Sequence, residues 1–306
     1  MRIGYPCINR SIGCSPSGTF RLASYSPDRL ETTVERNLAC LMEILRYNVR
    51  SGFFFFRISS DMVPFASHPV CTFPWQERFK KTFSGIGSFI RQHHVRISMH
   101  PDQFVLLNTP KEDVLSRSIA ELRYHADVLD LMGLDETAKI QLHAGGIYGD
   151  KPASMERFVR NYDLLDSTVR RRLVIENDER LYSAADCLAL HERTGVPILL
   201  DSFHHALHNN GEPVTDLLAP IRASWKPMDG IPMLDYSSQQ PGKRAGAHAE
   251  HIDERDFSAF LTETRASDFD IMLEIKDKEA SARVALSLAR KDPRLVTGPA
   301  GLAKST

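Results

Sequence analysis

The chain has 306 residues, a formal net charge of −1, and 42% hydrophobic and 25% charged residues. Its length allows one sizeable hydrophobic core or two small domains, and its composition is that of an ordinary globular protein without a long low-complexity tract. The near-neutral charge neither favours nor excludes a nucleic-acid partner, so any phosphate-binding surface must be local.

Short runs of β-branched or aromatic residues alternate with longer amphipathic stretches, which favours βα units over a sandwich or a helical bundle. We expect eight strands, at residues 2–5, 53–59, 95–99, 139–143, 173–176, 197–201, 231–236 and 270–274. Between the first two strands, leucine and valine recur at helical spacing over residues 30–45, after the start signal Ser26-Pro27-Asp28. The pattern therefore predicts strands that alternate with helices.

Eight βα units in a chain of this length predict an α/β fold, a single closed (β/α)8 TIM barrel over residues 1–291. The Gly/Pro-rich tail, residues 292–306, is expected to be flexible. A doubly wound open sheet is the alternative fold. It is less favoured because no Gly-rich dinucleotide turn follows the first strand.

Cysteine usage and hydropathy suggest where the protein resides. The five cysteines are odd in number and form no CxxC pair, so we expect reduced thiols in a cytoplasmic protein; they are Cys7, Cys14, Cys40, Cys71 and Cys187. The apolar run at residues 52–56 is far too short for a membrane span, and the first ten residues lack the apolar core of a signal peptide. We therefore expect no membrane partner.

Imidazole and carboxylate side chains recur at the ends of the predicted strands, which in a TIM barrel form the mouth. The strand-end residues are His100, His143, Glu176, Asp201 with His204, Asp235 and Glu274, and flanking segments add His68 and His248. Carboxylates crowded in one pocket repel one another and are costly to desolvate, and divalent cations remove that cost. Mixed histidine and carboxylate sets suit zinc or manganese, and bridging carboxylates hold ion clusters.

Other charged and imidazole side chains are interpreted as structural or solvated. The basic run at residues 170–172 precedes the fifth strand, so it is expected to lie in solvent at the opposite end of the barrel. The histidines in helices and flanking turns are His93, His94, His125, His191, His205, His208 and His251.

The chain resembles the UV-damage endonucleases, metal-dependent DNA repair nucleases related to xylose-isomerase-like barrels. The matching motifs span almost the whole chain in the family's order: GYPCIN at 4–9, FRISSDMVPFASHP at 56–69, SMHPDQFVLLN at 98–108, LHAGG at 142–146, IEND at 175–178, LLDSFHH at 199–205, GAHAEHI at 246–252 and MLEIKDKE at 272–279. The resemblance implies metal-assisted incision immediately 5′ of cyclobutane pyrimidine dimers and 6-4 photoproducts, and often at abasic sites, in double-stranded DNA.

The resemblance also implies a cluster of up to three divalent ions, usually manganese, with zinc or magnesium as alternatives. The implied ligands are His68, His100, His143, Glu176, Asp201, His204, His248 and Glu274, with Glu176 as the bridging carboxylate. Relatives carry Lys-x-His in the seventh strand, where this chain has Met233 and Asp235. Aspartate can still bind manganese, so Asp235 joins the ligand set. Any role of the lysine is absent from this chain, which leaves the occupancy of the third metal site open.

Two glutamates and two lysines are the candidates for chemistry beside the metals. Glu176 or Glu274 could act as a base, although a metal ion could suffice without one. If the eighth strand continues beyond Glu274, period-two alternation puts Lys276 and Lys278 on the same face, where they could neutralise phosphate or carboxylates. We count Lys276 among the catalytic candidates.

The pair Gln103-Phe104 follows the third strand and, by the resemblance, forms the wedge that enters the duplex at a lesion. An aromatic ring can replace lost stacking, worth about 1–3 kcal/mol per base. Extruding a damaged nucleotide costs less than extruding a paired one, so selectivity can come from deformability. The alternative is that Phe104 packs beneath its loop.

Further DNA contacts are expected around the barrel mouth. Tyr5 and Asn9 resemble positions that line the damage pocket, with ordinary packing as the alternative. The candidates for phosphate contacts are Arg57, Lys243, Arg244, Lys276 and Lys278.

Two other functions fit parts of this pattern. A sugar isomerase or epimerase of the same superfamily would use a similar metal cup, but would have little use for an exposed Gln103-Phe104. A non-catalytic binder of damaged DNA would keep the wedge and lack turnover. We expect a monomeric enzyme.

Overall fold

The computed structural model describes residues 1–298 and contains a closed barrel of eight parallel strands in sequence order. The strands are β1 (Ile3–Pro6), β2 (Phe55–Ile58), β3 (Arg96–Met99), β4 (Lys139–His143), β5 (Leu173–Glu176), β6 (Ile198–Asp201), β7 (Met233–Tyr236) and β8 (Asp270–Leu273). The barrel closes where Ile3 pairs with Ile271 and Gly4 with Met272. The predicted (β/α)8 barrel is confirmed, although several strands are shorter than expected.

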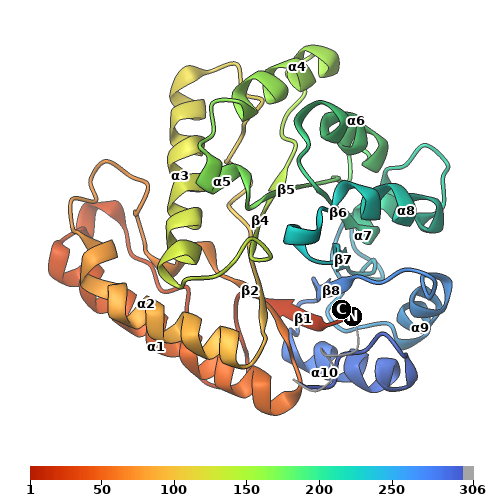
Figure 1. The fold of residues 1–306 in the computed structure, drawn as a ribbon, viewed down its shortest axis with the longest axis horizontal. Coiled ribbons are helices and arrows are strands. Elements are labelled where there is room, and N and C mark those ends of the chain that lie inside the picture. Colours follow the sequence, from red (N-terminus) through yellow and green to blue (C-terminus); the bar gives the residue numbers. More distant parts are fainter. Residues whose placement is uncertain (299–306) are drawn as a thin grey trace.

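Helices surround the strands as an outer ring (Figure 1). They are α1 (Pro27–Ser51), α2 (Trp75–Gln92), α3 (Glu112–Leu131), α4 (Lys151–Tyr162), α5 (Ser167–Arg170), α6 (Ala184–Thr194), α7 (Ser202–Leu207), α8 (Val214–Ser224), α9 (Glu254–Glu263) and α10 (Glu279–Leu288). As predicted, Ser26 caps α1 by accepting the Arg29 N–H at 3.2 Å. The helix ends at Gly52, whose φ of 82° suits a residue without a side chain.

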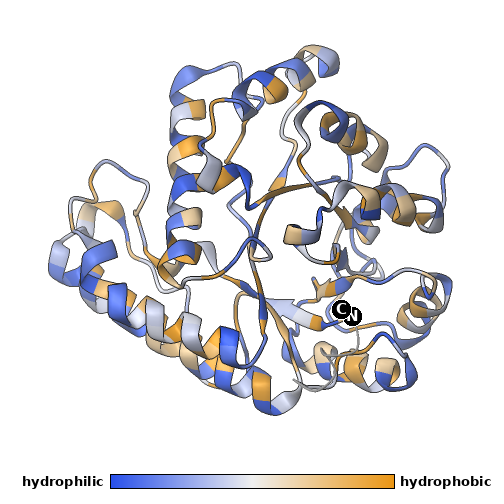
Figure 2. Cartoon of the chain, in the orientation of Figure 1, coloured by the Kyte–Doolittle hydropathy of each residue, from blue (hydrophilic) through white to orange (hydrophobic). Residues whose placement is uncertain are grey.

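The core lies inside the barrel and between the strands and helices. All residues of β1, β2, β3, β5, β6, β7 and β8 are buried. The predicted stripe of α1 faces inward: Leu30, Val34 and Leu38 are each at most 1% exposed. Figure 2 shows hydrophobic residues along the strands and alternating with hydrophilic ones along α1. This packing fixes the strand ends that carry the site.

The cysteine expectation is wrong for one pair. Cys14 and Cys40 form a disulfide, whereas Cys7, Cys71 and Cys187 are free thiols. The pairing depends on how the segment between β1 and α1 folds back, which brings the two Cα atoms to 5.9 Å. A count of cysteines and the absence of a CxxC motif carry no information about that fold-back.

The basic run at residues 170–172 is not uniformly solvated, which corrects the expectation from the sequence. Arg170 and Arg171 are exposed, but Arg172 is 1% exposed. The Arg172 guanidinium donates to the Asp130 carboxylate and to the backbone carbonyls of Leu134 and Ala138. Arg172 therefore ties β5 to the end of α3, and the correction follows from partners that lie far away in sequence.

The first residues of the predicted tail pack against the barrel. Arg294 donates to the backbone carbonyls of Thr264 and Ser267, and the Val296 N–H donates to the Met1 carbonyl. The rest of the predicted tail, residues 299–306, lies outside the described residues. Among the helices of residues 1–298, none combines the length and the apolar character needed to cross a membrane.

Candidate metal centre

The carboxyl ends of neighbouring strands bring the predicted polar residues together. His143 and Glu176 are register partners at the ends of β4 and β5, and Asp201 and Asp235 are register partners on β6 and β7. His100 directly follows β3. Because all strands are parallel, their carboxyl ends share one rim, and these side chains form a polar cup there.

Ligand atoms in the cup gather in three overlapping groups, and within each group the atoms lie within 4.8 Å of one another. The groups are His100, His143 and Glu176; Glu176, Asp201 and His204; and Asp201, Asp235 and Glu274. Glu176 belongs to the first two groups and Asp201 to the last two. Sharing of this kind is the arrangement that a carboxylate needs in order to bridge neighbouring ions.

Glu176 lies at the centre of the first two groups and is 1% exposed. Its Oε2 is 3.5 Å from His100 Nε2, and its Oε1 is 3.4 Å from His143 Nδ1 and 3.7 Å from His204 Nδ1. His204 Nδ1 is also 3.3 Å from Asp201 Oδ2. Most of these separations exceed a good hydrogen bond, so the groups face one another across space that a cation would fill.

The donor atoms themselves fit a metal ion. Within residues 1–298, His143 Nδ1 and Asp201 Oδ2 are buried and have no hydrogen-bond partner, which is rare for polar atoms unless a ligand or ion satisfies them. His100 Nδ1 contacts the Pro101 carbonyl at 2.7 Å, which fixes the ring and leaves Nε2 directed at Glu176. Metal-binding histidines usually have such an outer partner.

The pKa shifts of the carboxyl groups in the cup differ in direction, according to the charge beside each one. Burial raises the pKa of Asp201 to about 7, with Glu274 and Glu176 adding to the rise and His204 opposing it. Burial also raises the pKa of Asp235 well above its usual range. Burial would raise the pKa of Glu176 too, but the imidazoles of His143 and His100 outweigh it and lower the pKa. A divalent ion would displace protons from such carboxylates.

An arginine side chain lies inside the cup. Arg57, on β2, is 3% exposed, and its Nη2 donates to Asp235 Oδ2 at 2.6 Å and to Gln141 Oε1 at 2.7 Å. Its Nη1 donates to Glu274. The sequence interpretation placed Arg57 on a DNA phosphate. The side chain instead points into the barrel, because residues alternate in direction along a strand.

Gln141 belongs to the cup and was missed from the sequence. Its Nε2 donates to Glu176 and, at 2.6 Å, to Asp235 Oδ2, so it links the middle of the cup to Arg57. The signal was present, because Gln141 precedes His143 by two residues in one strand and therefore shares its face.

Two predicted ligands lie outside the three groups. His68 is exposed in the segment after β2, where its Nδ1 accepts the Val70 N–H at 3.1 Å. His248 lies at the rim, with Nε2 3.9 Å from Glu274 Oε2 and Nδ1 2.9 Å from the Glu274 carbonyl. Loop positions such as these do not follow from strand periodicity.

The expected common face of Glu274, Lys276 and Lys278 does not form, because β8 ends at Leu273 and residues 276–278 make a turn. Lys276 Nζ pairs instead with Glu250 at 2.6 Å, outside the cup. Lys278 has a φ of 58°. Burial lowers the pKa of Lys278, while Cys7 and Glu274 oppose the shift.

The segment after β3 presents Gln103 and Phe104 to solvent. Phe104 is 71% exposed, so it does not pack beneath its loop. The base of the segment is fixed, since Leu107 is fully buried and the Leu106 N–H donates to Ser118 Oγ at 2.9 Å. The segment thus holds an apolar ring out from a rigid support.

Tyr5 and Asn9 are buried rather than exposed at the mouth. The Tyr5 hydroxyl contacts Asn48 Oδ1 on α1 at 2.5 Å, and Asn9 Nδ2 donates to the same hydroxyl at 2.7 Å. This is the packing alternative. Lys243 and Arg244 are exposed in the segment between β7 and α9.

Another aromatic residue near the mouth was missed from the sequence. Tyr148, after β4, is 45% exposed with a φ of 46°, and the Arg157 guanidinium lies 5.5 Å from its ring centre. Arg157 also donates to the Asn108 carbonyl at 2.9 Å, which links Tyr148 to the segment that carries Phe104.

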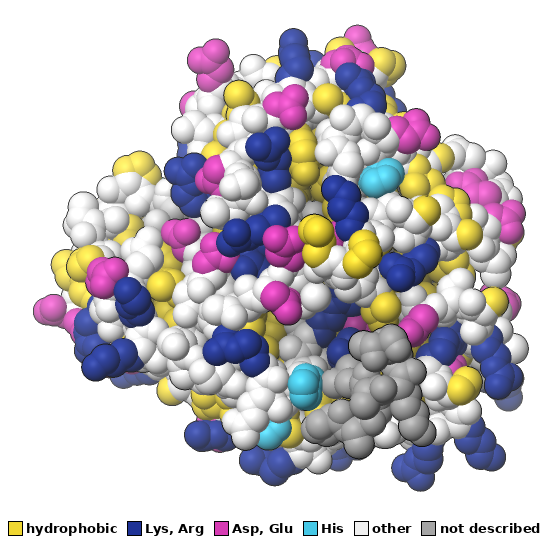
Figure 3. Space-filling model, viewed as in Figure 1, with side chains coloured by type: hydrophobic (Ala, Val, Ile, Leu, Met, Phe, Trp, Pro, Cys, Tyr) yellow, Lys and Arg dark blue, Asp and Glu magenta, His cyan; other side chains and the backbone are white. Residues whose placement is uncertain are grey.

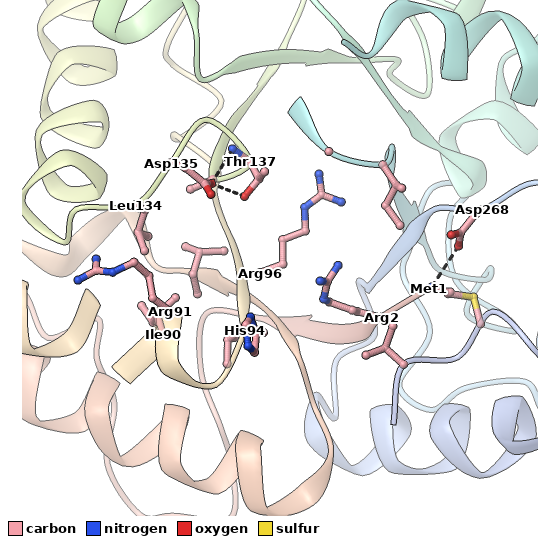
Figure 4. A pocket seen from close by; sticks show the side chains of 16 residues that line it. Met1, Arg2, Ile90, Arg91, His94, Arg96, Leu134, Asp135, Thr137 and Asp268 are labelled. Atoms are coloured by element: carbon pink, nitrogen blue, oxygen red, sulfur yellow. Dashed lines mark hydrogen bonds and ion pairs between the residues drawn. The ribbon is translucent and has the colours of Figure 1, made fainter. Parts of the chain in front are cut away.

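A separate hollow of about 490 Å³ is lined by residues from the amino ends of the strands (Figure 4). Two of its arginines are already paired with an acid: Arg2 and Arg96 donate to Asp270 Oδ2 at 3.0 and 2.8 Å. The Met1 amino group pairs with Asp268 at 3.1 Å. Basic and acidic side chains are interspersed on the face shown in Figure 3. This hollow lacks the imidazole and carboxylate set of the cup.

A closed parallel barrel with histidines and carboxylates gathered at its carboxyl end defines a TIM-barrel protein with a site suited to divalent cations. Residues 1–297 match the family model described as UV-endonuclease UvdE. The chain belongs to this family of UV endonucleases. The resemblance read from its motifs is confirmed, and the protein is an enzyme of the nuclease class.

Relatives match over most of this chain. The UV DNA damage endonuclease of Clostridium perfringens (strain 13 / Type A) is 36% identical over 284 residues, which cover 92% of this chain and 69% of that protein. The crystal structure of SacUVDE matches with a TM-score of 0.91 and 44% identity, over 95% of this chain and 98% of that one. Endonuclease IV from Thermus thermophilus, at 15% identity and a TM-score of 0.60 over 95% and 100% of the two chains, shares the fold.

Proposed function

We propose that the protein cuts double-stranded DNA at the phosphodiester immediately 5′ of UV photoproducts, by hydrolysis that divalent cations assist. Cyclobutane pyrimidine dimers and 6-4 photoproducts are the proposed substrates, with abasic sites as a further class. The observation that carries the proposal is Glu176, a buried carboxylate shared by two groups of ligand atoms. Family membership supports DNA as the substrate.

The proposed ligands of the first two ions are His100, His143, Glu176, Asp201 and His204. When bound, such ions lower the pKa of water and stabilise the charge on the departing oxygen. Manganese is the proposed metal because the donors mix carboxylate oxygens with imidazole nitrogens; zinc and magnesium are the alternatives. The compartment remains predicted as the cytoplasm and the assembly as a monomer.

The protein's own groups orient this centre. Gln141 holds Glu176, and Arg57 holds Glu274. Burial raises the pKa of Glu274, but Arg57 outweighs it and lowers the pKa to about 2. A carboxylate this acidic is a weak general base near neutral pH, so we assign Glu274 an orienting role.

Lesion recognition is proposed for the exposed Gln103-Phe104 pair. Phe104 can occupy the stacking space left by an extruded nucleotide, and Gln103 can bond to the base that lost its partner. A polyol isomerase would have little use for a ring that is 71% exposed beside its mouth. A DNA binder without turnover would keep this feature, so activity must be measured.

The test is nicking of supercoiled plasmid with and without prior UV irradiation, followed by mapping on an end-labelled duplex with one defined dimer. We expect manganese-dependent nicking of irradiated DNA, a cut 5′ of the dimer, and no nicking after chelation. A sugar isomerase would nick neither plasmid, and a binder would shift the irradiated DNA in a gel without cutting it. Equal nicking of both plasmids would contradict lesion recognition.

A further inference from the structure

The third group of ligand atoms differs from the other two because a cation of the protein already lies within it. Asp235 and Glu274, two of its three members, both accept hydrogen bonds from the Arg57 guanidinium. Asp235 Oδ1, like His143 Nδ1 and Asp201 Oδ2, is buried without a hydrogen-bond partner within residues 1–298. Among the described residues, however, no arginine donates hydrogen bonds to two members of either of the first two groups, as Arg57 does in the third. The three groups are therefore not equivalent metal sites.

The Arg57 contacts are specific and buried. Nη2 reaches Asp235 Oδ2 at 2.6 Å, and Gln141 Nε2 reaches the same oxygen at 2.6 Å from β4. Nη2 also donates to Gln141 Oε1 at 2.7 Å. Asp235 is fully buried and Arg57 is 3% exposed, so neither group can turn out into solvent without breaking this arrangement.

A divalent ion and this guanidinium would compete for the same oxygens. Arginine keeps its charge in proteins, so it cannot make room by losing a proton. Two cations a few ångströms apart in a buried site repel strongly. The guanidinium also binds one oxygen of Asp235 and one oxygen of Glu274 through directed hydrogen bonds, which a metal ion at those oxygens would have to replace.

The seventh strand is consistent with this arrangement. Where the resemblance implies Lys-x-His, the chain has Met233, which is fully buried and offers no charged or imidazole donor, and Asp235, which binds Arg57. His68, another implied ligand, is exposed and lies outside the ligand groups. Within the described part of the chain, the third group thus has no donor at Met233, one oxygen of Asp235 engaged by Arg57 and His68 displaced, while His248 Nε2 stays at the rim, 3.9 Å from Glu274 Oε2.

We infer that the Arg57 guanidinium takes the place of one of the three cations implied by the family resemblance. The cup then binds two divalent ions, one with His100, His143 and Glu176 and one with Glu176, Asp201 and His204. This inference rests on the proposed function, since it concerns ions in the same site. Arg57 acts as a positioning residue, and its guanidinium places a permanent positive charge beside the Asp235 and Glu274 carboxylates.

The test measures manganese content after equilibrium dialysis, by inductively coupled plasma mass spectrometry on protein of known concentration. We expect two ions per wild-type chain, one for each of the first two ligand groups. Arg57→Lys keeps the charge and should leave that number unchanged. Arg57→Met removes the charge at similar size, frees Asp235 and Glu274, and should raise the number by one.

A second variant tests the inference independently in case Arg57→Met does not fold. Circular dichroism monitors the folding of each variant. Asp235→Asn should still bind two ions per chain, with a manganese affinity within about twofold of that of the wild type, because Asp235 binds arginine and not metal. Three ions in the wild type, or loss of an ion in Asp235→Asn, would overturn the inference while leaving the proposed function intact. An unchanged count in folded Arg57→Met would also overturn it. A wild type that binds no ion would overturn both.

Discussion

At the amino ends of the strands, Arg2 and Arg96 converge on Asp270, and Lys139 pairs with Asp229. At the carboxyl ends the acids are Glu176, Asp201, Asp235 and Glu274, with Arg57 as the arginine among them. Both ends are buried and both contain acid–base pairs. They differ in whether the protein supplies enough positive charge for its own carboxylates.

This difference distinguishes the amino end of the barrel, which stabilises the fold, from the carboxyl end, which holds the candidate site. Arg96 and Asp270 form a buried ion pair that is neutral without a ligand, although Arg2 Nε and Arg96 Nε have no hydrogen-bond partner among the described residues. At the carboxyl end, the atoms without partners among the described residues include Asp201 Oδ2 and His143 Nδ1, which can bind a cation and belong to residues of the ligand groups. The carboxyl end can therefore bind a cation from solution, and it is the end where chemistry is possible. Substitutions at the two ends should separate these roles.

The largest expected effect is at Glu176. Glu176→Gln removes the shared carboxylate, so incision should fall by about 10²–10³-fold or more, as for loss of a central electrostatic group. Metal content should fall with it, measured on the same preparation. His251→Ala is the matched control, because His251 pairs with Asp277 outside the ligand groups and should retain wild-type activity. Full activity of the Glu176 variant would remove it from the centre.

The opposite end should respond in stability rather than activity. Asp270→Asn leaves the buried Arg96 and the half-buried Arg2 without their carboxylate, so unfolding in urea should show a loss of about 3–5 kcal/mol. Asp113→Asn, which breaks an exposed pair with Arg117, is the control and should cost less than about 1 kcal/mol. The incision rate per folded molecule should not change in either variant. A selective loss of turnover in Asp270→Asn would contradict the expectation that the amino end affects stability and not activity.

Manganese should stabilise the fold through the carboxyl end alone. Free ion at about 100 times its dissociation constant adds about 2.7 kcal/mol of stability per site, visible as a higher thermal midpoint. The increase should persist in Asp270→Asn and shrink in Glu176→Gln. Equal increases in both variants would indicate ions bound elsewhere.

The smallest expected effect concerns recognition. Phe104→Ala should reduce the preference for a dimer-containing duplex by about 1–3 kcal/mol, because the stacking surface is lost. Leu164→Ala removes another exposed apolar side chain and serves as the control. Metal content should match the wild type in both, and a parallel loss of metal in Phe104→Ala would argue against a separate recognition element.

The sequence indicated which strand residues lie together at the rim better than it placed the loop residues. His143 and Glu176 could be placed because parallel strands in a barrel share one rim, and the register then pairs them directly. His68 could not be placed, since the path of a loop has no periodicity. The Cys14–Cys40 pair likewise depends on a fold-back between β1 and α1.

Arg57 shows a second limit of prediction from the sequence. Its strand was predicted, but an arginine near a mouth that is expected to bind DNA is naturally assigned to phosphate. Its true partners, Asp235 and Gln141, come from β7 and β4 across the barrel. Such a contact depends on strand tilt and closure, which local sequence does not encode. Gln141 was within reach of period-two reasoning from His143.

Asp201 uses its two oxygens for different purposes. Oδ1 accepts the His204 N–H at 2.7 Å and starts α7, while Oδ2 faces the ligand group. One carboxylate thus sets both the helix origin and the direction from which His204 approaches. Residues 208–213, beyond α7, could therefore vary in length across homologues without shifting the imidazole, whereas a single insertion between positions 201 and 204 would misalign it.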